Sequence, residues 1–422
     1  DSRGNPTVEV DLETGFGVFR SSVPSGASTG KYEAWELRDK DPNRYEGKGV
    51  LKAIENIEKI IRPVLIGKDC RKQKEIDNIL IQLDGTENKS KLGANAILSV
   101  SEAVCRAGAR AKKIALYRHI WQLSEEKSLL KKIFAKVKNK KLFLPTPSIL
   151  MVEGGMHAGN SLDFQEFMAV PFEKSYKEKL RKGTEIYHEL EKVLKASYGD
   201  SAVNVGFEGG YAVPQFSKTK EVLDAIKKAI VLAGQENQAK IVIDCAASSF
   251  FKKDFYFFEG KNYNKEELLN FYTEIYQNYP IFAFEDPFAE EDFGGFKEIT
   301  EKLGENILII GDDLLVTNPK KIAIAQNENL CNALLLKPNQ IGTVSEAITA
   351  ANLAKKYNWK IMVSHRSGET MDDFIADFAV GIGAEYVKFG APSRGERVAK
   401  YNRFSAIEAD LIQIQNQNAA PK

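Results

Sequence analysis

The chain has 422 residues, of which 43% are hydrophobic and 28% charged, an ordinary globular composition with a formal net charge of +1. The balanced charge gives no reason to expect nucleic acid or a membrane as the main partner, and no apolar run approaches the roughly 18 residues that a membrane helix needs. The four cysteines, Cys70, Cys105, Cys245 and Cys331, form no CxxC pair, which favours buried thiols in a reducing compartment over disulfides.

Residues 1–125 predict a small α+β domain with a truncated start. The chain opens at Asp1 instead of methionine and is predicted to begin inside a strand, so we expect a preceding segment, with any targeting signal, to be missing. Residues 5–20 alternate apolar and polar around a glycine-containing turn, which predicts a β-hairpin. Three helical stretches follow between about 48 and 120. Residues 126–142 are rich in lysine and predict a linker.

Residues 143–422 alternate short apolar runs with helical stretches, the pattern of a TIM-like (β/α)8 barrel. In such a barrel the interior is packed with apolar side chains and the chemistry lies at the carboxyl ends of the strands. Six runs are clearest, and each ends in a charged or polar residue: Asp244, Glu285, Asp312, Lys337, His365 and Lys388.

Three successive strand ends carry carboxylates, namely Asp244, Glu285 and Asp312. Side chains at neighbouring strand ends point toward one mouth, so these groups would repel one another unless a cation neutralised them. Ligands that offer only oxygen suit a hard ion, Mg²⁺ before Zn²⁺. Each residue could instead cap the helix after it, but three in succession favour a metal site.

The next two strand ends combine an amine with groups that suit an anion. Lys337 beside a metal site can have its pKa lowered and act as a base, with a structural ion pair as the alternative. In the string SHRSGET, Arg366 can clamp a phosphate with two hydrogen bonds and Ser367 can donate a third. This part of the rim therefore suits a phosphorylated substrate.

Two of the four histidines, His157 and His365, stand in the glycine-rich strings EGGMHAGN and SHRSG, where a functional role and a structural role are both open. The other two, His119 and His188, lie in helical patterns and are predicted to be at the surface.

Three further residues are candidates in predicted loops. Glu166 and Glu208 lie in LDFQEFM and VGFEGGY, where they could approach a ligand or remain solvated charges. Ser28 in GASTG could contact a phosphate or a metal, although the string by itself favours a generic Ser/Gly turn.

Taken together, long strings spread over almost the whole chain resemble the enolase family closely. The resemblance implies an α/β fold in which a smaller α+β N-terminal domain precedes a barrel of unusual start, ββαα(βα)6. It also implies a cytoplasmic lyase of glycolysis and gluconeogenesis that reversibly removes water from 2-phosphoglycerate to give phosphoenolpyruvate. The matching strings include DSRGNPTVEVD, VPSGASTG, KLGANAILSVSEAVCRAGA, HAGN, QEFM, EDPF, GDDLLVTNP, LLLKPNQIG, SHRSGET, FIADFAVG and GAPSRGERVAKYN.

The same resemblance implies two Mg²⁺ ions. One would bind the three carboxylates Asp244, Glu285 and Asp312, and the other would arrive with the substrate and contact Ser28. Lys337 matches the family's general base, and Glu208, supported by Glu166, matches the acid that assists loss of hydroxide. The substrate contacts that the resemblance implies are His157, His365, Arg366, Ser367 and Lys388.

Several positions depart from the family pattern. Phe207 replaces an aspartate beside Glu208, which removes a charge that would influence the pKa of the acid. The family's dimer contact pairs an N-terminal glutamate, here Glu9, with a C-terminal arginine, where this chain has Ala406, so the expected homodimer is weakened. The remaining departures are Glu153 for Asn, Met156 for Ser, Ser249 for Glu, Pro338 after Lys337, and Phe389 for Thr.

These departures leave other functions open. The chain could be a catalytically weak or inactive enolase-like protein with a structural role and an assembly partner. It could also be another metal-dependent lyase of the superfamily, although SHRSGET and GASTG suit a phosphate and argue against that function.

Overall fold

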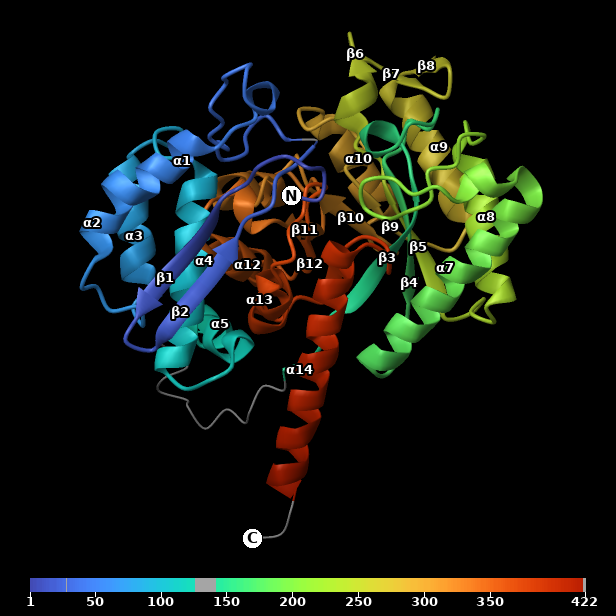
Figure 1. Cartoon of the computed structure of the whole chain (residues 1–422). Coiled ribbons are helices and arrows are strands. Elements are labelled where there is room, and N and C mark those ends of the chain that lie inside the picture. Colours follow the sequence, from blue (N-terminus) through green and yellow to red (C-terminus); the bar gives the residue numbers. More distant parts are fainter. Residues whose placement is uncertain (28, 126–141, 420–422) are drawn as a thin grey trace.

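A computed structural model describes residues 1–27, 29–125 and 142–419 (Figure 1). The N-terminal part opens with an antiparallel hairpin of β1 (Glu9–Thr14) and β2 (Gly17–Ser22), as predicted. The chain does not begin inside a strand. Residues 1–8 precede β1, and the N–H of Gly4 donates to the carbonyl of Asp1 in a turn.

The helical region after the hairpin is divided into more elements than the three predicted stretches. α1 (Leu51–Asn56), a π-helical segment (Ile57–Ile61) and α2 (Arg62–Leu65) follow one another directly, and α3 (Gln73–Asp84) comes next. The last predicted stretch is two helices, because Lys113 adopts a left-handed φ of 56° that ends the first. These two are α4 (Ala94–Ala111) and α5 (Leu116–Glu125).

α5 joins the N-terminal part to the barrel. It packs against α13 (Phe374–Ile382), and its buried Tyr117 and Ile120 belong to the apolar core of the barrel. The division at residue 125 therefore stays a prediction. The predicted lysine-rich linker, apart from its last residue, lies outside the described residues.

Eight strands close into a barrel whose first three members alternate in direction. β3 runs antiparallel to β4, and β4 antiparallel to β5, whereas all other neighbours are parallel. Two helices, α7 (Tyr176–Tyr198) and α8 (Thr219–Leu232), separate β4 from β5, which gives the predicted order ββαα(βα)6. The strands are β3 (Thr146–Glu153), β4 (Glu166–Pro171), β5 (Ala239–Asp244), β9 (Ile281–Glu285), β10 (Leu308–Gly311), β11 (Ala333–Leu336), β12 (Lys360–Ser364) and β13 (Tyr386–Lys388).

The remaining helices surround the barrel, and several begin at residues whose side chains cap the first turn. Asn264 accepts from the N–H of Glu267 while the Glu267 side chain accepts from the N–H of Asn264, a capping box. The last helix extends well beyond the barrel in Figure 1. These helices are α9 (Lys265–Asn278), α10 (Phe293–Leu303), α11 (Pro319–Asn327), α12 (Val344–Lys356), α13, and α14 (Gly395–Ala419).

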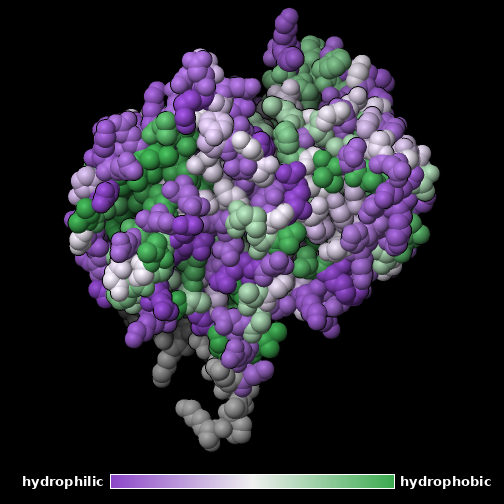
Figure 2. Space-filling view, in the orientation of Figure 1, coloured by the Kyte–Doolittle hydropathy of each residue, from purple (hydrophilic) through white to green (hydrophobic). Residues whose placement is uncertain are grey.

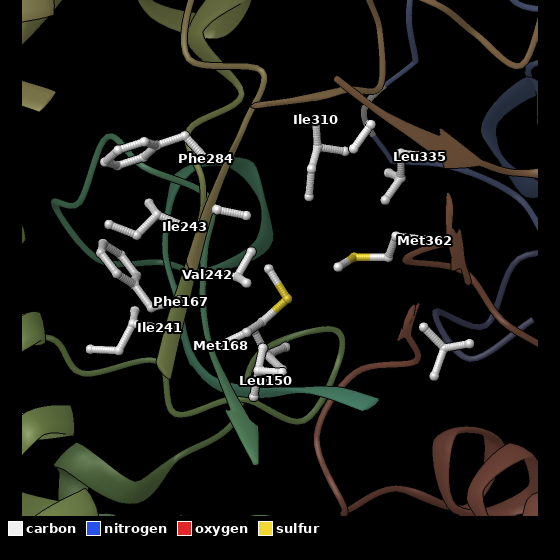
Figure 3. Packing of buried hydrophobic residues seen from close by; sticks show 14 of the residues in the cluster. Leu150, Phe167, Met168, Ile241, Val242, Ile243, Phe284, Ile310, Leu335 and Met362 are labelled. Atoms are coloured by element: carbon white, nitrogen blue, oxygen red, sulfur yellow. The ribbon is translucent and has the colours of Figure 1, made fainter. Parts of the chain in front are cut away.

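The barrel interior is apolar, as the uninterrupted hydrophobic runs predict. Figure 3 shows Val242, Ile310, Leu335 and Met362 from different strands pointing toward a common centre. All four are at most 1% exposed, and burying each such side chain contributes about 1.5–3 kcal/mol. This rigid packing supports the polar residues at the strand ends.

Outside the barrel, two surface features stand out. A small antiparallel sheet of β6 (Phe251–Lys252), β7 (Phe255–Phe258) and β8 (Lys261–Tyr263) follows β5. An open groove of about 710 Å³ lies between the hairpin and the first helices, and Leu12, Ile57 and Leu65 are among its lining residues. Figure 2 shows the hydrophobic area on this side of the molecule.

Two expectations drawn from composition can be compared with the structure. All four cysteines are free and buried, as predicted. None of the helices formed by the described residues combines the length and the apolar character needed to cross a membrane.

Candidate active site

The six polar residues predicted at strand ends all lie at the carboxyl ends of barrel strands. Asp244, Glu285 and Lys388 are the last residues of β5, β9 and β13. The other three, Asp312, Lys337 and His365, follow directly after β10, β11 and β12. All six side chains are buried. The barrel therefore gathers them at one rim, where burial strengthens every electrostatic interaction among them.

Lys388 lies among three carboxylates. Its Nζ atom is 2.8 Å from Oδ2 of Asp244, 2.9 Å from Oε1 of Glu285 and 3.2 Å from Oε2 of Glu166. Burial lowers the pKa of an amine, but the negative charges of Asp244 and Glu166 outweigh it and raise the pKa of Lys388 well above its ordinary value. Lys388 is therefore an ammonium ion that balances part of the acidic cluster.

Lys337 contacts the remaining carboxylate of the predicted metal set. Its Nζ atom lies 2.6 Å from Oδ2 of Asp312, whose Oδ1 accepts from Nε2 of Gln340 at 2.9 Å. Burial lowers the pKa of Lys337, but the charge of Asp312 raises it, and the net result is a pKa above the ordinary value. The expectation of a lowered pKa is wrong for this structure, because the amine forms the ion pair that was its alternative.

The donor set fits a divalent cation. Asp244 and Glu285 are direct partners across β5 and β9, and Oε2 of Glu285 is buried without a hydrogen-bond partner among the described residues. Burial and the charge of Asp244 raise the pKa of Glu285 well above its ordinary value. A carboxylate oxygen left without a partner in such a cluster is a site that a hard cation can occupy.

Asp312 approaches other acidic residues more closely than it approaches this pair. Its carboxylate forms a group with Asp286 and Asp313 that is close enough to share one ion, whereas the three predicted ligands do not yet form such a group. Both carboxylate oxygens of Asp286, however, accept backbone N–H groups, from Asp312 at 2.9 Å and Asp313 at 2.7 Å. Asp286 therefore stabilises the turn after β10.

A second cluster joins Glu208 to both predicted histidines. Nε2 of His365 lies 2.8 Å from Oε2 of Glu208, and Nδ1 of His157 lies 3.6 Å from Oε1 of Glu208 and 3.4 Å from Oε1 of Glu166. Burial raises the pKa of Glu208, but the two imidazoles outweigh it and lower the pKa well below its ordinary value. Glu166 is the first residue of β4, not a loop residue, and both glutamates are buried, so neither is a solvated loop charge.

The phosphate-binding candidates face the loop that carries Ser28. Arg366 forms two hydrogen bonds with the carboxylate of Glu33, each 3.0 Å long, and Oγ of Ser367 accepts from the N–H of Ala27 at 2.6 Å. Ser28 itself lies outside the described residues. The structure thus places Ser367 beside Ala27 and Arg366 beside Glu33, one residue before and five residues after the predicted serine in the sequence.

One small polar cavity connects these clusters. Gln165 and Ser364 complete its wall. The cavity brings together the amine of Lys337 and the carboxylate of Glu208, which are the two groups predicted for proton transfer. The predicted residues that line it are His157, Glu166, Glu208, Lys337, His365, Arg366, Ser367 and Lys388.

Two family models match the chain. One is described as "Enolase, N-terminal domain" and covers residues 1–120, and the other as "Enolase, C-terminal TIM barrel domain" and covers residues 141–420. The chain belongs to the enolase family. A protein named "Enolase" from Mastigamoeba balamuthi is 51% identical over 424 residues, which cover 97% of this chain and 93% of that protein. The chain is accordingly a lyase of the enolase type, and no observation supports a purely structural role.

The structure gives physical reasons for several departures from the enolase pattern. Phe389 is fully buried and packs on Phe404, with ring centroids 5.5 Å apart, so it belongs to the contact between β13 and α14. Lys337 has φ −126° and ψ 108°, the extended geometry predicted before Pro338. Met156 and Ser249 are exposed. None of these side chains other than Lys337 lines the polar cavity.

One prediction about the histidines is wrong. His119 is fully buried, because α5 packs against the barrel, and burial together with the charge of Lys112 lowers its pKa to about 4. His188 is exposed on α7, as predicted.

The sequence analysis missed Arg397, a fully buried residue of α14. Its Nη1 atom lies 2.7 Å from Nδ1 of His365. Because a guanidinium only donates, Nδ1 is an acceptor, and the proton of the neutral ring is on Nε2, facing Glu208. The arginine stands in the string SRGERVAKYN, but a helix position carries no signal of the kind that marks strand ends.

Proposed function

We propose that the chain catalyses the reversible, Mg²⁺-dependent dehydration of 2-phosphoglycerate to phosphoenolpyruvate in glycolysis and gluconeogenesis. The observation that carries the proposal is a polar cavity lined by both Lys337 and Glu208. The fold alone would not identify the function, because one fold hosts many functions. Here the residues suited to base, acid and anion binding meet in one place.

Lys337 is proposed as the base. Its neutral amine takes the proton from the carbon next to the substrate carboxylate, and the electron pair of the broken C–H bond moves into that carboxylate. Such a proton is barely acidic, so the step needs positive charge beside the carboxylate oxygens. Lys388, an ammonium ion at the same rim, is proposed to contact that carboxylate.

Glu208 is proposed as the acid. When the electron pair returns from the carboxylate to form the C=C bond, the C–O bond of the neighbouring hydroxyl breaks, and the proton of Glu208 converts the leaving hydroxide into water. The negative charge of the bound substrate favours the protonated form of Glu208. Glu166, His157 and His365 contact this group or one another and hold it in place.

Asp244, Glu285 and Asp312 are the residues that would hold a Mg²⁺ ion, and Ser28 is proposed as a contact of a second ion. When bound, the ions would neutralise the negative charge that develops on the substrate carboxylate. The donor set supports this assignment, because it offers only oxygen and contains the unpartnered Oε2 of Glu285. Arg366 and Ser367 are proposed to bind the substrate phosphate.

We also propose a cytoplasmic location, which the four free, buried thiols support. A homodimer stays a prediction. Glu9 lies 3.3 Å from Arg20 of its own hairpin, and Ala406 is exposed on α14.

The test is direct assay of the purified chain with 2-phosphoglycerate and Mg²⁺, following the ultraviolet absorbance of phosphoenolpyruvate. We expect turnover that stops when the ions are chelated and returns when Mg²⁺ is restored. No turnover with Mg²⁺ present would contradict the proposed function, and turnover of an unphosphorylated acid in preference to 2-phosphoglycerate would contradict the proposed substrate.

A further inference from the structure

Glu153, the last residue of β3, is fully buried beneath the loop that carries Glu208. Its Oε1 atom accepts two backbone N–H groups of that loop, from Glu208 itself at 2.9 Å and from Gly210 at 2.7 Å. The carboxyl group therefore holds the backbone on both sides of Gly209, at the residue proposed as the acid.

The loop is shaped to receive this carboxyl group. A Cβ atom on Gly206 would lie 2.3 Å from Oε2 of Glu153, and one on Gly210 would lie 3.0 Å from its Cγ. Neither position tolerates a side chain, so the two glycines let the loop close over Glu153. Oε2 itself is buried and has no hydrogen-bond partner among the described residues.

The side chain directly before the acid brings no charge to this arrangement. Phe207 is 39% exposed, and its ring centroid lies 6.4 Å from that of His157. Its carbonyl accepts from Nη2 of Arg397 at 3.2 Å, and its N–H donates to the carbonyl of His157 at 3.4 Å. This chain thus has no charge at position 207 and has a buried carboxyl group at position 153. The two departures both lie next to Glu208, Phe207 in sequence and Glu153 through its hydrogen bond to the Glu208 N–H, and one gains the acidic group that the other lacks.

We propose that Glu153 is a positioning residue for Glu208: its carboxyl group fixes the loop that carries the acid and supplies, from beneath that loop, a second carboxyl charge beside it. Burial and the charge of Glu208 raise the pKa of Glu153 to about 8. The other groups that face Glu153 are His157, which lowers this pKa, and Glu166, which raises it. Arg394 and Arg397 approach the same loop through its carbonyls.

The functional consequence follows from like charges. Because the two carboxyl groups repel each other when both are ionised, they keep one proton between them over a wide pH range, and ionised Glu153 accompanies the protonated form of Glu208, which is the form needed to release water. This inference rests on the proposed role of Glu208. In Glu153→Gln one side-chain oxygen still accepts the two N–H groups, but the charge is gone. We expect the alkaline limb of the pH profile of kcat to move down by about one pH unit, with KM little changed.

The matched control is Glu102→Gln. Glu102 is likewise buried with a pKa of about 8, but it lies on α4 and contacts Ser21. It should leave the kinetic limb in place. The rescue variant is Glu153→Gln combined with Phe207→Asp, which returns a carboxylate to the loop and should move the limb back up.

Phe207→Asp alone keeps the test decisive if Glu153→Gln does not fold, because position 207 is partly exposed. It should raise the alkaline limb, and an unchanged limb would overturn the inference. An unchanged profile in folded Glu153→Gln would do the same. Glu208→Gln separates the two proposals: if it is inactive while Glu153→Gln is unshifted, only this inference fails, and if Glu208→Gln keeps the full rate, the proposed role of Glu208 fails first.

Discussion

The Nζ atom of Lys388 lies 2.8 Å from Oδ2 of Asp244, although the two residues are 144 positions apart. The barrel makes this contact possible, because β13 and β5 end at the same rim. The amine is also in contact with Glu285 and Glu166. One buried cation thus offsets part of the repulsion among three buried carboxylates.

Replacing Lys388 by methionine should destabilise the protein strongly. Removing one member of a buried ion pair leaves uncompensated charge and typically costs about 3–5 kcal/mol. Urea unfolding without divalent ions measures the loss. The control is Lys320→Met, whose exposed partner is Glu87 and whose effect should stay within about 0.5 kcal/mol. Equal stabilities for the two variants would show that Lys388 does not balance the cluster.

Glu285→Gln should abolish the thermal stabilisation that Mg²⁺ gives the protein. A ligand that binds only the folded state stabilises it by about 2.7 kcal/mol at one hundred times its Kd. The amide removes one of the buried carboxylate charges that an ion would neutralise, so we expect no rise in melting temperature on adding Mg²⁺. Glu291→Gln, at an exposed position, should keep the rise. A rise of the same size in Glu285→Gln would contradict the predicted ligand set.

Arg397→Lys should lower kcat more than it changes KM. A lysine cannot reproduce the donors that Arg397 gives to Nδ1 of His365, the carbonyl of Arg366 and the carbonyl of Ser367. Small misplacement of groups that act together costs on the order of 10- to 100-fold in rate. Nitrogen NMR of His365 should also show a changed tautomer balance. Unchanged kcat with an unchanged His365 signal would show that the contact does not orient the ring.

Glu102→Gln should make stability less dependent on pH. Burial and the negative charge of Asp372 raise the pKa of Glu102 from 4.5 to about 8. Between these values the folded protein keeps a proton that the unfolded chain has lost, so the free energy of unfolding falls as pH rises, by at most about 1.4 kcal/mol per pH unit. Urea unfolding from pH 5 to pH 8 should show a shallower fall in the variant. Parallel curves for the two proteins would contradict this assignment.

The strand ends were predictable because a barrel imposes a simple rule on sequence. Each strand is buried on both faces, so an apolar run that ends abruptly in Asp244, Glu285 or Lys337 marks the rim directly. The departures from the family at positions 207 and 389 could be recognised only by comparison with the family pattern. Their consequences depend on the surroundings of each side chain, because Phe207 is exposed whereas Phe389 is buried against Phe404.

Residues that act across the fold carried no such signal. Glu33 reaches Arg366 from the N-terminal part, and Arg397 reaches His365 from α14. Neither stands at a strand end or in a local motif with a mechanism. His119 was misplaced for the same reason, since the sequence does not show that α5 packs on the barrel. The role of Glu153 likewise depends on its contact with the N–H of Glu208, 55 positions away in the sequence.

The most direct measurement of the proposed chemistry is exchange of the proton next to the carboxylate of 2-phosphoglycerate with heavy water, in the presence of Mg²⁺. If Lys337 removes that proton and Glu208 acts only afterwards, Glu208→Gln should still exchange it while forming no phosphoenolpyruvate. Lys337→Ala should lose exchange and dehydration together, each by at least about 100-fold. Exchange at the rate of the unaltered chain in Lys337→Ala would mean that another group is the base, and the account of this site would fail.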